Sequence, residues 1–183
     1  MELLREIYDK DIKFEQKNNS ICYKIRKAAR TILFNDAGEI ALLFVSKNNY
    51  HKLPGGGVES GEDLSTTLER EVLEEVGAEI DTLGEIGIII EYRDEGELLQ
   101  ISYCYYSCTK GELNKPSFTE CEVSNGFRLK WVSPDNVVSI IEKDSPNNYV
   151  GRFIRERDLT FLRKAIDMGL DKKEIRNRCL NSI

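Results

Sequence analysis

Short apolar runs recur along the chain, separated by turn residues, and they predict the strands of a sheet. The runs lie at 21–27, 30–34, 40–45, 84–91, 99–108 and 127–132. Within 127–132 the apolar residues alternate with Arg128 and Lys130, which is the period of a strand that buries one face. The sequences Asn-Asp-Ala-Gly at 35–38 and Asp-Glu-Gly at 94–96 fit hairpin turns between neighbouring runs.

Three other segments carry the signals of helices. The first is predicted over about 63–77, where Gly77 is typical of a helix C-terminus. Ser-Pro-Asp at 133–135 marks the start of a second helix that continues through 137–141, and the last covers about 151–168. Strands before and after a central helix predict a mixed α/β domain rather than a regular βαβ repeat.

The length of 183 residues fits one well-buried domain better than two. We predict an N-terminal arm over 1–20 that is partly helical, a domain over 21–145, and a C-terminal helix with a polar tail over 146–183 that packs on the same domain. The apolar runs are shorter than the ~18 residues of a membrane-spanning helix, and the charged N-terminus does not resemble a signal peptide. We therefore expect a cytoplasmic protein without a membrane partner.

Charge and residue counts exclude further classes. A formal net charge of −6 and a pI of about 5.1 argue against generic nucleic-acid binding, which depends on neutralising phosphates. The segment 152–178 is an exception, because its basic residues outnumber its acidic ones. The single histidine, His51, excludes a multi-histidine metal site, and the absence of a C-x-x-C pair argues against a zinc cluster.

The most informative stretch is a glycine-rich loop followed directly by an acidic helix. Glycines at 55–57 permit close backbone approach, so that peptide groups can face a metal or a phosphate. On a helix Glu71, Glu74 and Glu75 fall within an arc of roughly 100° and repel one another. Alone, they would more simply form a solvated acidic face. Next to this loop, they favour a divalent cation, and their hard oxygen ligands favour Mg²⁺ or Mn²⁺.

The same stretch resembles the Nudix box, the signature of the MutT-like Nudix hydrolase family. From Gly56 to Ala78 the chain reads G-x5-E-x7-R-E-V-x-E-E-x-G-A, which agrees with every fixed position of the box. A looser resemblance extends over roughly 28–142. It implies a Nudix fold, an α/β/α sandwich around a mixed β-sheet, and an enzyme that hydrolyses a nucleoside diphosphate linked to another group.

The resemblance also implies roles for residues of the box. Glu71, Glu74 and Glu75 would hold the metal, with the carbonyl oxygen of Gly55 as a further ligand. Glu62 and Arg70 would form a salt bridge that orients the loop and the helix. That pair would act structurally rather than in the chemistry.

The general base that activates the attacking water is less well defined, because the family uses either a box glutamate or an acid from a distant loop. We expect Glu71 or Glu74 to be catalytic, with a loop acid assisting. Glu120 and Glu122 are the candidates for that acid, and the alternative is that they belong to a solvated surface loop.

The sequence thus predicts Mg²⁺- or Mn²⁺-dependent hydrolysis of a pyrophosphate bond in a small nucleotide. Nucleoside triphosphates, dinucleoside polyphosphates and sugar nucleotides stay open as substrates, and no nucleotide-binding residue is indicated. Two alternatives are a non-catalytic module that senses nucleotides and an RNA 5′-end pyrophosphohydrolase, the latter motivated by the basic segment 152–178. Nucleic acid is otherwise not expected as a partner, and a homodimer is compatible with the sequence.

Overall fold

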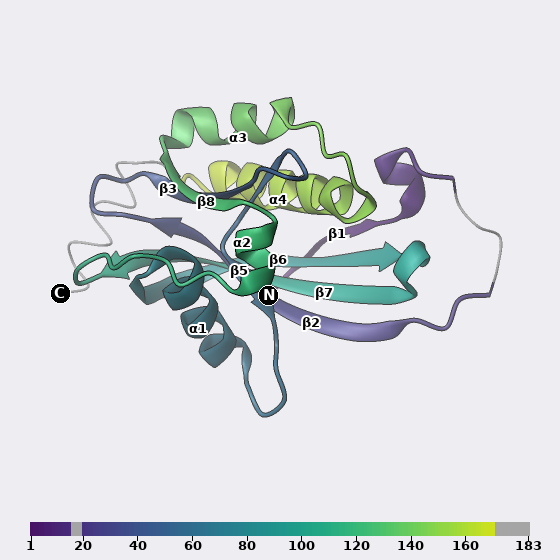
Figure 1. Ribbon diagram of the computed structural model, residues 1–183, viewed down its shortest axis with the longest axis horizontal. Helices are drawn as coiled ribbons and strands as arrows, with labels where there is room; N and C mark the ends of the chain where they lie inside the picture. Colours follow the sequence, from purple (N-terminus) through teal and green to yellow (C-terminus); the bar gives the residue numbers. More distant parts are fainter. Residues whose placement is uncertain (16–19, 171–183) are drawn as a thin grey trace.

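A computed structural model describes residues 1–15 and 20–170 (Figure 1). The polar tail predicted at the C-terminus lies largely outside these residues. Within them, one eight-stranded sheet runs through the middle of the molecule in the order β1-β6-β7-β2-β3-β4, with β5 paired to β2 and β8 paired to β3. The strands are β1 (Leu3–Ile7), β2 (Lys24–Phe34), β3 (Ile40–Val45), β4 (Tyr50–Lys52), β5 (Gly55–Gly57), β6 (Glu79–Arg93), β7 (Leu98–Lys110) and β8 (Phe127–Val132).

The sheet is mixed and is covered on both faces, which confirms the predicted α/β/α sandwich. β1 pairs with β6, and β2 with β7, in parallel, whereas the other pairs are antiparallel. Figure 1 shows α1 on one side of the sheet and α3 with α4 on the other. The helices are α1 (Leu64–Val76), α2 (Glu120–Ser124), α3 (Pro134–Lys143) and α4 (Tyr149–Asp167), with 3₁₀ turns η1 (Asp9–Ile12) and η2 (Asp94–Gly96).

Alternation along β2 divides the apolar core between these two layers. Ile32 and Phe34 belong to the larger cluster, which also contains Phe153 of α4. Leu33, one residue out of phase, belongs to the smaller cluster with Val72 of α1. Because successive strand residues point to opposite faces, the continuous apolar run at the end of β2 anchors helices on both sides of the sheet.

The central helix α1 ends at the glycine read from the sequence, and it begins at a cap that the sequence analysis did not name. The Asp63 carboxylate accepts a hydrogen bond from the backbone N–H of Thr66 at 2.8 Å. Gly77, with φ of +76°, takes the left-handed conformation and donates its N–H to the carbonyls of Val72 and Leu73. These two caps fix which residues of the helix face the core and which face the glycine segment.

Several expectations about secondary structure were wrong or incomplete. The N-terminal arm was expected to be partly helical, but it contributes strand β1 to the sheet and only the short turn η1. Residues 24–27 of the first run and the whole run 30–34 belong to the single strand β2, whose residues all pair with β7 in one register. Strand β4 and helix α2 were not predicted, and the glycine loop contains the short strand β5. The predicted boundaries at residues 20/21 and 145/146 stay predictions.

Among residues 1–15 and 20–170, none of the helices combines the length and the apolar character that crossing a bilayer requires.

A buried charge network joins α4 to the sheet. Arg157 and Asp158 of α4 and Glu91 of β6 are all fully buried. Glu91 accepts hydrogen bonds from Arg93 at 2.9 Å and from Gln100 at 2.7 Å, and it lies 3.6 Å from Arg157. Burial alone would raise the pKa of Glu91, but Arg93 and Arg157 outweigh it and hold the pKa at about 2.

We expect Glu91→Gln to lower the free energy of unfolding by about 3–5 kcal/mol, because it leaves two buried arginines without their shared counter-charge. Urea denaturation measures this loss. Glu79→Gln is the control, since Glu79 is exposed on the same strand, and it should change stability by less than about 0.5 kcal/mol. Equal stabilities for the two variants would contradict the role given to Glu91.

Candidate functional site

The glycine segment is held against β2, and its close approach explains why glycine is needed. Gly55 pairs with Arg30, and Gly56 with Ala29, in an antiparallel register. Gly55 has φ of +129°, and a Cβ there would lie 2.2 Å from the carbonyl oxygen of Ala29. A Cβ on Gly56 would lie 2.1 Å from Glu71 Oε1, so the Glu71 carboxylate rests directly on this peptide.

Arg70 connects the glycine segment to the acidic helix. Its Nε donates to Glu62 Oε1 at 2.7 Å, and its Nη2 donates to Glu62 Oε2 at 3.0 Å, which is a bidentate pair. Its Nη1 also contacts Glu71 Oε1 at 2.9 Å and Glu74 Oε2 at 3.5 Å. The hydrogen bonds from Arg70 lower the pKa of Glu62 to about 2. One guanidinium therefore contacts three carboxylates, whereas the sequence suggested only one pair.

Glu75 lies deeper than the other two helix glutamates and has its own cation. Its Oε1 accepts a hydrogen bond from Lys52 Nζ at 2.6 Å, and its Oε2 accepts the N–H of Gly55 at 2.8 Å. Lys52 Nζ also donates to the carbonyl oxygen of Gly55 at 3.2 Å. Burial raises the pKa of Glu75 to about 7, although Lys52 and the Gly55 N–H favour the charged form.

These groups surround a pocket of about 260 Å³ with an acidic and a basic side. Glu71, Glu75 and Glu122 line the acidic side, and basic residues of the sheet line the other. The full lining is Arg26, Arg30, Tyr50, Lys52, Gly55, Gly56, Gly57, Glu71, Glu75, Arg93, Gln100, Glu122, Phe127, Val150 and Ile154. Glu74 and Glu120 are not among these residues. Glu74 lies on the same helix with 38% of its side chain exposed.

The two acids expected in a surface loop instead belong to the short helix α2. Glu122 accepts hydrogen bonds from the backbone N–H and the hydroxyl of Thr119 at 2.8 and 2.9 Å, and this closes a capping box. The same residue lines the pocket, whereas Glu120 is exposed. The structure thus separates two candidates that the sequence left equivalent.

The donor chemistry fits a hard divalent cation, although no preformed cluster is present. Among the described residues, no group of three or more His, Cys, Asp or Glu side chains is arranged to hold a metal ion. Instead, Arg70 engages Glu71 and Glu74 while Lys52 engages Glu75. Yet the Lys52 ammonium is itself a cation held by a carboxylate and by the Gly55 carbonyl. Such oxygen donors suit Mg²⁺ or Mn²⁺.

Sequence reasoning did not identify Lys52 or the arginines of the pocket. Arg26 and Arg30 are four residues apart on β2 and so share one face of the strand, together with Ile32. A charged residue at the strand period inside an otherwise apolar run is a signal that could have indicated them. Gln100 and Arg93 come from β7 and β6, and only the pairing of those strands with their neighbours brings them to the pocket.

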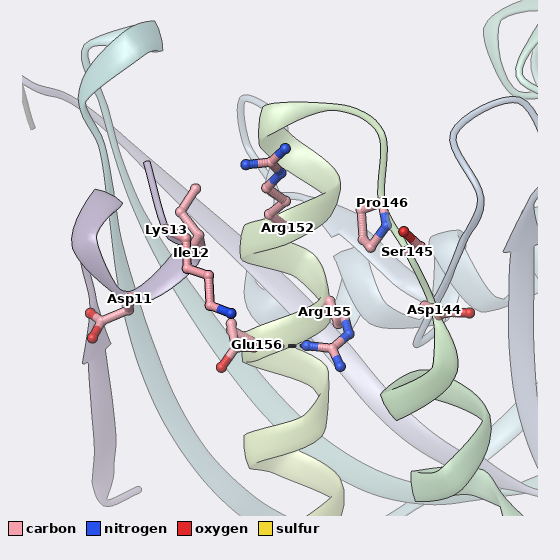
Figure 2. Close-up of a pocket in the computed structure, with 9 residues that line it drawn as sticks. All are labelled: Asp11, Ile12, Lys13, Asp144, Ser145, Pro146, Arg152, Arg155 and Glu156. Carbon is pink, nitrogen blue, oxygen red and sulfur yellow. Dashed lines mark hydrogen bonds and ion pairs between the residues drawn. The ribbon is translucent and has the colours of Figure 1, made fainter. Parts of the chain in front are cut away.

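A second hollow lies away from the box, between η1, the α3–α4 connection and α4 (Figure 2). It has a volume of about 390 Å³ and contains both signs of charge. Arg155 pairs with Glu156 at 3.1 Å and also donates to the carbonyls of Ile141 and Glu142. Because none of the box residues lines this hollow, it is not the candidate active site.

A family comparison shows to which protein family the chain with this pocket belongs. The model of the NUDIX domain matches residues 24–152, which is more than half of the chain. The chain belongs to the Nudix family. It is therefore an enzyme of the Nudix hydrolases, whose general reaction is hydrolysis of a pyrophosphate bond. The family resemblance read from Gly56 to Ala78 is confirmed.

Solved Nudix-type structures share the fold at low sequence identity. The MutT protein from Methanosarcina mazei Go1 is 21% identical, with a TM-score of 0.54, over 79% of this chain and 98% of that chain. A NUDIX-family hydrolase from Clostridium perfringens is 16% identical, with a TM-score of 0.52, over 74% and 95%. A NUDIX hydrolase from Nitrosomonas europaea is 17% identical, with a TM-score of 0.53, over 73% and 87%.

The two glycines of the pocket should respond differently to alanine. Gly55→Ala brings a Cβ against backbone and should cost at least about 2 kcal/mol of unfolding free energy. Gly56→Ala meets only the flexible end of Glu71, so we expect a loss below about 1 kcal/mol but a displaced carboxylate and slower hydrolysis. Urea denaturation together with hydrolysis rates tests the pair. A Gly56→Ala enzyme of normal activity would show that the Glu71 position is unimportant.

Proposed function

We propose that this Nudix hydrolase cleaves the pyrophosphate bond of a small nucleotide with the help of Mg²⁺ or Mn²⁺, by attack of water at phosphorus. The observation that supports the proposal is the pocket at Gly55–Gly57, which carboxylates of α1 and basic residues of the sheet line together. The two sets of residues meet at Gly55, whose N–H donates to Glu75 and whose carbonyl oxygen accepts from Arg30. A pyrophosphate carries several negative charges and needs cations on all sides, which this arrangement supplies once metal balances the carboxylates.

In this proposal Glu71, Glu74, Glu75 and the Gly55 carbonyl oxygen would hold the metal. When bound, it would neutralise the pyrophosphate and polarise the phosphorus that is attacked. Arg70, tied to Glu62, keeps the acidic helix and the glycine segment in a fixed relation. That pair positions the ligands rather than reacting.

Glu74 or Glu71 would accept the proton of the attacking water. Burial and the neighbouring charge of Glu71 raise the pKa of Glu74 above its usual value, in spite of Arg70, which makes it a better base than a free glutamate. Glu122 is the assisting acid we favour over Glu120, because it lines the pocket.

The pocket is too small for a complete nucleotide. Its volume of about 260 Å³ is below the usual range for small-molecule sites, roughly 300–1,000 Å³. We therefore place the phosphates inside it and leave the base outside the described pocket. Nucleoside triphosphates, dinucleoside polyphosphates and sugar nucleotides all meet this condition.

The structure gives no support to the RNA 5′-end alternative from helix α4. Four of its five basic residues are engaged within the protein: Arg155 pairs with Glu156, Arg157 is buried in the charge network, Arg163 pairs with Glu142, and Lys164 pairs with Glu2. Arg152 lines the hollow of Figure 2, away from the box residues. The basic residues of 152–178 that follow residue 170 lie outside the described part of the chain. A cytoplasmic location and a homodimer stay predictions from the sequence.

A substrate panel tests the proposed reaction. We expect release of phosphate or nucleotide from at least one nucleoside triphosphate, dinucleoside polyphosphate or sugar nucleotide in Mg²⁺ or Mn²⁺, and no release after EDTA treatment. Product analysis by chromatography identifies the bond that is cut. A folded protein that binds a nucleotide but returns it intact with either metal would instead support the sensing alternative.

Glu74→Gln should lower the hydrolysis rate by at least about 100-fold, since it removes both a metal ligand and a candidate base. The fold should persist, because this side chain is partly exposed. Glu69→Gln is the matched control on the same helix, where Glu69 is exposed and bonds only Ser65 among its described neighbours. Near-normal rates in Glu74→Gln, measured with the substrate found in the panel, would refute the metal assignment.

A further inference from the structure

The basic side of the pocket contains an arginine that is buried without an ion pair. Arg30 is only 5% exposed, and its Nη1 donates to the Gly55 carbonyl oxygen at 2.8 Å. Its Nε has no hydrogen-bond partner. In the described part of the chain, no carboxylate oxygen lies within 4 Å of its guanidinium nitrogens. A buried charge bonded only to a neutral carbonyl is costly unless another group balances it.

Arg26 and Arg93 continue this surface. Arg26 lies on the same face of β2, beside Gly57, and its Nη1 donates to Gln100 Oε1 at 3.4 Å. Within the described residues it likewise has no carboxylate partner. Arg93 is 5% exposed and shares Glu91 with Arg157, and its own Nε has no partner. Arg157 has a second pair with Asp158 at 2.7 Å, so Arg93 shares its one carboxylate, while Arg26 and Arg30 have none among the described residues.

The charge of Arg26 is also incompletely balanced. Burial lowers the pKa of Arg26, and the positive charge of Arg93 adds to this shift. Together with the missing carboxylate partners of Arg26 and Arg30, this favours an added anion at this end of the pocket.

We infer that Arg26, Arg30 and Arg93 form a subsite for a phosphate beyond the two that flank the scissile bond. The inference rests on the proposed function and narrows it. The acidic helix and its metal would bind the pyrophosphate that is cut, and the metal would balance the negative charge of that pyrophosphate. A substrate ending in a neutral sugar would leave the arginine subsite without an anion. A chain of three or more phosphates would fill it, as in a nucleoside triphosphate or a dinucleoside polyphosphate.

A purely structural role for these arginines has a different consequence. Arg30 could serve only to hold the Gly55 carbonyl, and its removal would then disturb the glycine segment. Arg26 makes no hydrogen bond to that segment, and its side chain is more exposed. Its substitution therefore separates phosphate binding from folding.

The binding test uses the whole protein in EDTA, where turnover is absent. We expect inorganic triphosphate to bind more tightly than inorganic pyrophosphate in isothermal titration calorimetry. Arg26→Gln should weaken triphosphate binding about tenfold, the usual effect of losing a charged hydrogen-bond donor. Arg26→Lys should restore part of the affinity. Arg152→Gln, which removes an arginine from the separate hollow of Figure 2, should leave the affinity unchanged.

Kinetics with metal provide the second arm. Arg26→Gln should raise KM about tenfold for ATP or diadenosine tetraphosphate, and it should leave KM for UDP-glucose or ADP-ribose unchanged. The larger increase, for ATP or for diadenosine tetraphosphate, identifies the type of phosphate chain. Equal binding of triphosphate and pyrophosphate, or equal losses in Arg26→Gln and Arg152→Gln, would overturn the inference. If the wild-type enzyme turns over no compound of the substrate panel, the proposed function fails, while the calorimetry still judges the subsite.

Discussion

The peptide group of Gly55 is the contact on which both sides of the pocket depend. Its N–H donates to Glu75 on the helix, and its carbonyl oxygen accepts from Arg30 on the sheet and from Lys52. The φ of +129° and the closeness of the Ala29 backbone restrict this position to glycine. A single residue thus brings an acidic helix on one face of the sheet within reach of basic side chains on the other.

The charge of the acidic helix is balanced by the protein itself. Arg70 contacts Glu62, Glu71 and Glu74, and Lys52 pairs with Glu75. The sequence argument assigned relief of the repulsion to a divalent cation alone. Because side chains already provide much of this relief, the fold of the acidic helix does not require a metal. A metal held as we propose would exchange with these partners at the carboxylate oxygens, so Arg70 and Lys52 would partly set its affinity.

The sequence was most informative where the determinants are local. The closing residue Gly77 and the spacing of the glutamates were enough to predict the central helix and its acidic face. Strand β1 and the arginines of the pocket could not be found in this way, because distant partners decide them: β1 is a strand only through its pairing with β6. Likewise, Arg26 becomes a pocket residue only because β2 and β7 place it beside Gln100.

Under the proposed function, strand β2 and helix α1 divide selectivity and chemistry between different elements. One face of the strand carries Arg26 and Arg30 towards the pocket and then Ile32 and Phe34 into the core. The apolar end fixes the strand, so the arginines are presented from a rigid surface rather than from a loop. The glutamates that we propose as metal ligands belong to α1, which packs on the opposite face. Under the proposed function, changes in the sheet residues would therefore alter which phosphate chain is accepted while the residues that support hydrolysis stay in place.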